Sequence, residues 1–242
     1  MATCEGSLWW YRCLHDLTVN ALLFHNISTE SRMLDAGCGT GGLLKKLLAK
    51  GYTNLSGFDL SEDAIEYASV ATGLDLKIHD ITELAQHYEA NSFDVIISHD
   101  IVCLLPLNKD VEALEQLFNL LKPGGILIMN LPALTAFHGT HDLAVGITKR
   151  YDKEAIKTLI GTRGSIENMI YWPFALSIPI YFTRLAQRTR LKMGSEKPII
   201  SDVKMINETL NTIFYKVSTL ENNILKSKPW GSSLFTTVKK NS

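Results

Sequence analysis

Cysteine is scarce in this chain, and its spacing forms no pairing or metal-binding motif. The four cysteines of the 242-residue sequence lie far apart and include no C-x-x-C pair. This pattern predicts neither a disulfide framework nor a zinc site. We therefore expect reduced thiols, a cytoplasmic protein and no bound metal.

The chain also lacks an excess of either charge. Its 24 Lys and Arg are matched by 25 Asp and Glu, which gives a formal net charge of −1. No basic cluster with interleaved aromatics is present, so no nucleic-acid partner is expected. The first residues show no basic region followed by an apolar core, and no Met-Gly or C-a-a-X signal occurs at either end. We expect no signal peptide and no lipid anchor.

What the sequence does contain is an alternation of strand and helix patterns. Hydrophobic residues make up 46% of the chain, enough for the core of one large domain. The alternation predicts an α/β fold: a doubly wound, mostly parallel seven-stranded sheet between two helical layers. We expect strands at about 32–36, 54–59, 74–79, 93–98, 126–130, 165–171 and 233–239, and helices at about 8–26, 42–50, 61–71, 109–121 and 152–160.

The flanking segments complete this single predicted domain. Its core is expected at about 30–172 and 231–240, with the strand near 233–239 pairing antiparallel at the sheet edge. The helix at about 8–26 is interpreted as a lid, although ordinary packing explains it almost as well. Residues 173–228 are expected to form a mostly helical insertion between the last two strands.

A glycine-rich turn follows the first predicted strand. Gly37, Gly39 and Gly42 fit the dinucleotide pattern G-x-G-x-x-G, whereas Asp35, Gly37, Gly39 and Gly41 fit the D-x-G-x-G-x-G pattern of S-adenosylmethionine (SAM) sites. Asp35 separates the two interpretations, because its carboxylate would repel two phosphates but attract an ammonium and a sulfonium. Asp59, at the end of the second strand, has the position for the ribose hydroxyls in either case.

The motifs in order resemble those of class I SAM-dependent methyltransferases, over about residues 30–131. They are Leu34–Gly41, Asp59, His79–Ile81, Phe93–Ile96 and Leu121–Gly125. The resemblance implies SAM as the methyl donor and S-adenosylhomocysteine as the product. It also implies adenine contacts from Asp80 and Ile81, and backbone contacts to the methionine part from Ser98 and His99. Leu60 is expected to pack on the adenine, and Cys38 to be a small packing residue of the turn.

Candidate catalytic residues lie in the loop after the fifth strand. His141 is the preferred general base, with Asp142 as an orienting partner and His138 beside them. A purely structural role for this group stays open, and His99-Asp100 is a further base candidate. Arg150 and Tyr151 either bind an acidic acceptor or lock the loop. Trp10 and Tyr11 of the first helix are expected to cover the acceptor.

The apolar run 170–182 is too short and too interrupted by proline for a membrane span. With the cations that follow it up to residue 192, it fits a pocket wall, a peripheral membrane contact or a dimer interface. The sequence predicts a SAM-dependent methyltransferase for a small-molecule or lipid-linked acceptor, as a monomer or homodimer. Two alternatives are a SAM-binding regulatory protein without catalysis and an NAD-dependent oxidoreductase.

Overall fold

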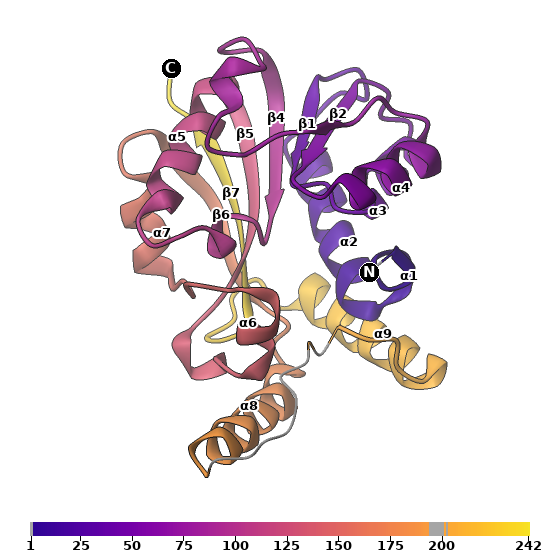
Figure 1. Ribbon diagram of the computed structural model, residues 1–242, viewed down its shortest axis with the longest axis vertical. Coiled ribbons are helices and arrows are strands. Elements are labelled where there is room, and N and C mark those ends of the chain that lie inside the picture. Colours follow the sequence, from indigo (N-terminus) through magenta and orange to yellow (C-terminus); the bar gives the residue numbers. More distant parts are fainter. Residues whose placement is uncertain (1, 194–200, 202) are drawn as a thin grey trace.

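A seven-stranded sheet forms the centre of the protein (Figure 1). The computed structural model describes residues 2–193, 201 and 203–242. Strands run in the order β3-β2-β1-β4-β5-β7-β6, and the first five are mutually parallel. Their bounds are β1 Met33–Ala36, β2 Leu55–Asp59, β3 Lys77–Ile78, β4 Phe93–His99, β5 Leu121–Pro132, β6 Gly164–Trp172 and β7 Ser233–Lys240. The predicted fold class is confirmed.

The antiparallel strand does not have the expected position at the sheet edge. β7 pairs antiparallel with β5 on one side and with β6 on the other. β6 is the outermost strand, because it pairs with β7 from Gly164 to Trp172 and has no second neighbour in the described sheet. β7 therefore lies between β5, the last of the five parallel strands, and the outermost strand β6.

Helices cover both faces of this sheet (Figure 1). α2, α3 and α4 supply one core, while α5 and α7 supply the other. The α-helices are α1 Ala2–Ser7, α2 Trp9–Phe24, α3 Gly42–Ala49, α4 Glu62–Thr72, α5 Lys109–Leu120, α6 Thr140–Val145, α7 Lys153–Ile160, α8 Ser177–Lys192 and α9 Glu208–Ile224, and the 3-10 helices are η1 Leu84–Gln86, η2 Val102–Leu104 and η3 Thr135–Phe137.

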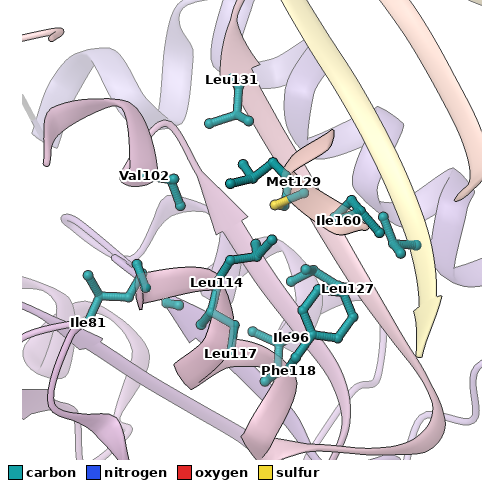
Figure 2. Packing of buried hydrophobic residues seen from close by; sticks show 14 of the residues in the cluster. Ile81, Ile96, Val102, Leu114, Leu117, Phe118, Leu127, Met129, Leu131 and Ile160 are labelled. Atoms are coloured by element: carbon teal, nitrogen blue, oxygen red, sulfur yellow. The ribbon is translucent and has the colours of Figure 1, made fainter. Parts of the chain in front are cut away.

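Strand alternation divides the apolar residues between the two cores. Along β5, Leu127 and Met129 enter the α5 core with Leu114 and Ile160 (Figure 2), whereas Ile128 enters the core formed with α2 and α3. Strands buried on both faces are nearly continuous apolar runs, which is why the bounds of β1 and β4 lie close to those predicted.

Elsewhere the bounds differ from the expectations. β5 starts at Leu121 rather than near 126, because Leu121 pairs with Phe93 before the glycine turn. β3 has two residues, and α1 precedes the first predicted helix. The predicted insertion contains α8 and α9, while its residues 194–200 and 202 lie outside the described part. Within the described residues, no helix combines the length and apolar character needed to cross a bilayer.

Candidate cofactor and acceptor site

The glycine turn lies at the C-terminal end of β1, between β2 and β4. Gly37, Gly39 and Gly41 have positive φ of 84°, 53° and 80°, which disfavours a side chain at each position. The backbone N–H groups of Gly37 and Cys38 both donate to the Phe58 carbonyl at 2.9 Å. A Cβ on Gly37 would lie 2.1 Å from Ile101 Cγ1, so the turn also touches the segment that follows β4.

Asp59 connects this turn to the start of α4. Its Oδ2 accepts from the Gly39 N–H at 2.9 Å, and its Oδ1 accepts from the Ser61 N–H at 3.0 Å. The carboxylate is thus fixed at the end of β2, where a nucleoside ribose is expected. Leu60, next to it, has a 65% exposed side chain. This apolar surface beside the carboxylate suits a base.

Glu5 of α1 is a site residue that the sequence did not reveal. Its Oε2 accepts from both the backbone N–H (2.9 Å) and the hydroxyl of Thr40, while Oε1 accepts from the Gly42 N–H at 3.4 Å. A carboxylate at this position also complements the N-terminal end of the α3 dipole. No motif or periodicity near residue 5 signals this contact, which joins segments 35 residues apart.

Three carboxylates converge on the turn. Burial, together with the nearby charges of Glu5 and Asp59, raises the pKa of Asp35 well above its usual value. A cationic ligand beside these groups would favour their ionised forms, whereas a diphosphate would be repelled. The arrangement therefore fits a positively charged nucleoside ligand.

The segment after β3 is less open than the sequence implied. Asp80 Oδ1 accepts from both the N–H and the hydroxyl of Thr82, each at 2.8 Å. Ile81 is 2% exposed and its side chain belongs to the α5 core. The side chain of Ile81 is thus engaged in core packing and does not face the predicted adenine position.

The end of β4 contributes two buried or partly buried side chains. Ser98 is 1% exposed, and its hydroxyl has no partner among the described residues. His99 Nε2 lies 3.1 Å from Thr18 Oγ1; because the Thr18 hydroxyl donates to the Leu14 carbonyl, we assign His99 as the donor. Burial and the nearby His15 lower the pKa of His99 to about 3, so its imidazole is neutral at physiological pH.

The loop after β5 is held by a buried ion pair. Arg150 donates from Nε to Asp142 Oδ2 at 2.6 Å and from Nη2 to Oδ1 at 2.7 Å. His138 Nδ1 lies 3.0 Å from the same Oδ2. Burial opposes ionisation of the fully buried Asp142, but Arg150 and His138 hold its pKa below the usual value. Asp142 thus pairs with His138 and Arg150, while His141 Nδ1 lies 3.2 Å from Ser201 Oγ.

Two predicted acceptor-binding residues also have internal partners. Tyr151 is 1% exposed, and its hydroxyl donates to Asp110 Oδ2 at 3.1 Å. Arg150 also donates to the Ala133 carbonyl at 2.9 Å. Both side chains are thus engaged with internal partners, an arrangement that favours the loop-locking role over binding of the acceptor. Asp142 is likewise a buried structural partner rather than a group exposed to an acceptor.

Aromatic side chains of α2 border the end of β4. Trp10 stacks on Trp172 of β6 at 5.3 Å between ring centroids, and Tyr11 meets Trp10 edge to face. Burial, and then the charges of Glu5 and Asp100, raise the pKa of Tyr11. Tyr11 therefore lies close to both Glu5 at the glycine turn and Asp100 after β4.

The fold and these contacts define an α/β domain with an acidic, glycine-rich turn at the C-terminal ends of its parallel strands. The family model described as "Methyltransferase domain" matches residues 27–159, and the chain belongs to this family. S-adenosylmethionine is the cofactor that membership implies, and the acidic turn fits its cationic character.

Individual relatives differ in what their names say they methylate. The chain is similar to phosphoethanolamine N-methyltransferase 1 of Arabidopsis thaliana, with 31% identity over 110 residues, 43% of this chain and 22% of the relative. It is also similar to the tRNA N(3)-cytidine methyltransferase METTL2 of Bos taurus, with 30% identity over 142 residues, 54% and 36% of the two chains. The match thus spans less than half the length of these relatives.

A solved SAM-dependent methyltransferase from Archaeoglobus fulgidus has the same fold. It superposes with a TM-score of 0.57 at 16% identity, over 93% of this chain and 94% of its own. At this identity the likeness concerns the fold alone.

Proposed function

We propose that the protein transfers a methyl group from SAM to a small-molecule or lipid-linked acceptor. The observation that carries this proposal is the convergence of Asp35, Asp59 and Glu5 on the glycine turn. Bound SAM supplies a methyl group activated by a positively charged sulfur. A dinucleotide oxidoreductase would need the same turn to accept two negative phosphates, which this acidic site opposes.

Each element of the site has a defined part in the proposal. Asp59 accepts the ribose hydroxyls, Asp80 accepts from the adenine amino group, and Leu60 packs on the base. Backbone carbonyls of the turn and backbone groups of residues 98–99 hold the methionine part. Asp35 and Glu5 provide negative charge for the ammonium and the sulfonium. Much of the rate then comes from alignment, because holding two reactants in line replaces a bimolecular encounter.

Incubation with methyl-tritiated SAM and a fractionated cell extract tests this function. We expect label in the small-molecule or lipid fraction, and none when the Gly39→Val variant replaces the wild type. Label in RNA would contradict the proposed acceptor class. The RNA fraction must be counted because the bovine relative is named a tRNA methyltransferase. Tight SAM binding without labelling of any fraction would support a regulatory protein. NADH binding without SAM binding would support the oxidoreductase.

We also propose that α8 contacts an anionic lipid surface. The helix contains no acidic residue, its cations Arg190 and Lys192 are exposed, and Figure 1 places it at the end of the molecule away from the sheet. Ile178, Phe182 and Leu185 are 52%, 61% and 41% exposed. An apolar stripe flanked by cations is typical of helices that lie in a membrane interface.

Two further contacts connect α8 with the loop after β5, residues 133–152, which we call the acceptor loop. Arg188 donates to the carbonyls of Ala136 and His138 at 2.6 and 2.8 Å. A cavity of about 280 Å³ opens between α8 and this loop, with an apolar lining that includes Phe137, Tyr181 and Trp230. Membrane contact through α8 would therefore present an apolar chain directly to the loop beside the transfer site.

Sedimentation with phosphatidylcholine vesicles, with and without phosphatidylserine, tests the lipid contact. We expect binding only to vesicles with phosphatidylserine, and loss of binding in the double variant Ile178→Ser/Phe182→Ser. Val70→Ser, at an 84% exposed position of α4, is the matched control. No binding to either vesicle, combined with wild-type dimers that the double variant lacks, would instead assign the face to self-association.

A further inference from the structure

We propose that Asp100 accepts the proton that the acceptor loses during methyl transfer, and that Asn130 and Trp172 position its carboxylate. The inference rests on the proposed function. It extends that function by naming the residue that accepts the proton and the chemical class of the molecule that receives the methyl group. It differs from the predicted use of His141, which lies on α6 beside Ser201.

The chain brings Asp100 to the border of the cofactor site. Asp100 directly follows β4, the strand next to β1 in the sheet. The next residue, Ile101, fills the space beside Gly37, where a Cβ would meet it at 2.1 Å. Asp100 is therefore held at the edge of the glycine turn, on the side where β4 and β5 end.

The backbone of Asp100 adopts a conformation that few aspartates have. Its φ is 56°, in the left-handed region that usually belongs to glycine. Two backbone contacts hold it there: its N–H donates to the Asn130 carbonyl at 2.8 Å, and its carbonyl accepts from Cys103 Sγ at 3.2 Å. Such strained positions are maintained where the surroundings over-determine them, often at functional sites.

A chain of hydrogen bonds fixes the orientation of the carboxylate. Trp172 Nε1 donates to Asn130 Oδ1 at 2.8 Å. Because an indole N–H can only donate, the Asn130 amide must turn its Nδ2 toward Asp100. That group donates to Asp100 Oδ2 at 2.9 Å and Oδ1 at 3.1 Å. Trp172 and Asn130 are both fully buried, so this orientation is set by the core.

The charged and titratable groups around Asp100 come from four elements. Arg150 from the acceptor loop and Asn130 from β5 favour the carboxylate, while Tyr11 from α2 and Cys103 from η2 stay uncharged because burial raises the pKa of each. Burial outweighs the two favourable groups and raises the pKa of Asp100 to about 7. A proton acceptor is most effective when its pKa lies near the working pH.

The proposed step combines methyl transfer with loss of one proton from the acceptor. The nitrogen or oxygen atom of an acceptor X–H bonds to the methyl carbon, the carbon–sulfur bond breaks with its electron pair going to sulfur, and the X–H proton passes to an Asp100 carboxylate oxygen. The acceptor class is therefore an amine or hydroxyl that has a proton to lose. Tertiary amines and thioethers, which need no proton acceptor, fall outside it. The neighbouring His99 is a weaker base than Asp100, because burial and the nearby His15 lower its pKa to about 3.

The experiment compares wild type with Asp100→Asn in the tritium-transfer assay and follows the Asp100 carboxyl by carbon-13 NMR. Asp94→Asn, the same change at the other end of β4, is the matched control. We expect Asp100→Asn to lower the transfer rate about 100-fold or more, with the SAM dissociation constant within about 3-fold of wild type. Wild-type transfer should rise with pH through about 7, in step with the NMR titration of Asp100.

Trp172→Phe tests positioning, because it keeps an aromatic side chain and removes the indole donor. Without that donor, the Asn130 amide can turn away from Asp100, and the hydrogen bond that lowers the Asp100 pKa is lost. The pH profile of Trp172→Phe should therefore lie at higher pH than that of wild type. Unchanged transfer in Asp100→Asn, or an NMR titration at the ordinary aspartate pKa, would overturn the inference while leaving the proposed function intact. A 100-fold loss in His141→Ala but not in Asp100→Asn would return the role to His141. Absence of any transfer by wild type would overturn both proposals.

Discussion

The Arg150–Asp142 pair is the buried contact on which the acceptor loop depends. Arg150 has a 6% exposed side chain, Asp142 has none of its side chain exposed, and two hydrogen bonds join them. Replacing Arg150 by alanine leaves a buried carboxylate without its main partner. We expect a loss of about 3–5 kcal/mol in the free energy of unfolding, measured by urea denaturation.

Arg163 provides the control for that change. Its ion pair with Glu115 is at the surface, with side-chain exposures of 33% and 57%, and such pairs contribute about 0–1 kcal/mol. Arg163→Ala should therefore have little effect on stability. Equal stability of the Arg150→Ala and Arg163→Ala variants, with methyl transfer lost only in the former, would favour acceptor binding by Arg150.

Asp59 has a structural role in the glycine turn and a proposed role in SAM binding, and Asp59→Asn tests the second. Its carboxylate holds the N–H groups of Gly39 and Ser61, and in the proposed function it also accepts the ribose hydroxyls. Asn can still accept from one N–H but has lost the charge. Hydrogen bonds to charged groups contribute about 1.5–3 kcal/mol, so Asp59→Asn should weaken SAM binding about 10- to 100-fold in calorimetry. Asp63→Asn, on the exposed first turn of α4, should leave affinity unchanged, and equal affinities in both variants would refute the ribose role.

At the scale of elements, α9 is oriented with polar side chains inward. Asn211, Ser218 and Glu221 are buried, whereas Leu210, Ile213, Leu220 and Ile224 are 46–64% exposed. Two of these buried groups bond to other elements: Asn211 contacts Ser7 and Trp9, and Glu221 accepts from the N–H groups of Phe174 and Ala175 ahead of α8. The helix thus joins the N-terminal helices to the segment that leads into α8.

Asn211 supplies the cap that α2 lacks in its own sequence. Its Oδ1 accepts from the Trp9 N–H at 2.7 Å and its Nδ2 donates to the Ser7 carbonyl at 2.9 Å, while Leu8 at the N-cap gives no side-chain bond. Asn211→Ala should lower the free energy of unfolding by about 1–2 kcal/mol in urea denaturation. Asn223→Ala, an exposed position of the same helix, should be neutral; equal effects would mean that the contact across the two helices contributes nothing.

At the scale of the whole molecule, buried neutral histidine makes stability depend on pH. The pKa of His99 is about 3 in the folded state against 6.5 for the free group. Protonation therefore favours the unfolded chain: the contribution of His99 is complete above pH 6.5 and declines as pH falls toward 3. His15, with a pKa lowered to about 4, acts in the same direction, whereas the raised pKa of Asp100 opposes both.

The variant His99→Gln isolates one of these contributions. Between pH 7.5 and 5, the unfolding free energy of wild type should fall by about 2 kcal/mol relative to that of the variant. Urea denaturation of both proteins at the two pH values measures this difference. A difference that does not change with pH would mean that His99 is protonated equally well in the folded state.

Most of the parallel sheet was predictable from the sequence, because local patterns determine it. The apolar runs of β1 and β4 and the glycine turn at Gly37 depend on neighbouring residues alone. The place of β7 was not predictable, since its pairing partners β5 and β6 are chosen by contacts across the whole chain. The contact of Glu5 with the glycine turn and that of Asp142 with Arg150 were not predictable for the same reason. Residue type and spacing do not reveal which buried group a charged side chain will contact.

The position of β7 has a consequence for how the protein is made. β5 and β6 leave the ribosome long before residues 233–240, yet in the described sheet β6 pairs with β7 alone and β5 depends on β7 for its second neighbour. While residues 173–232 are being synthesised, the nascent chain therefore carries two open strand edges that attract other chains. The yield of folded protein in a cell will depend on how well those edges are shielded until β7 arrives.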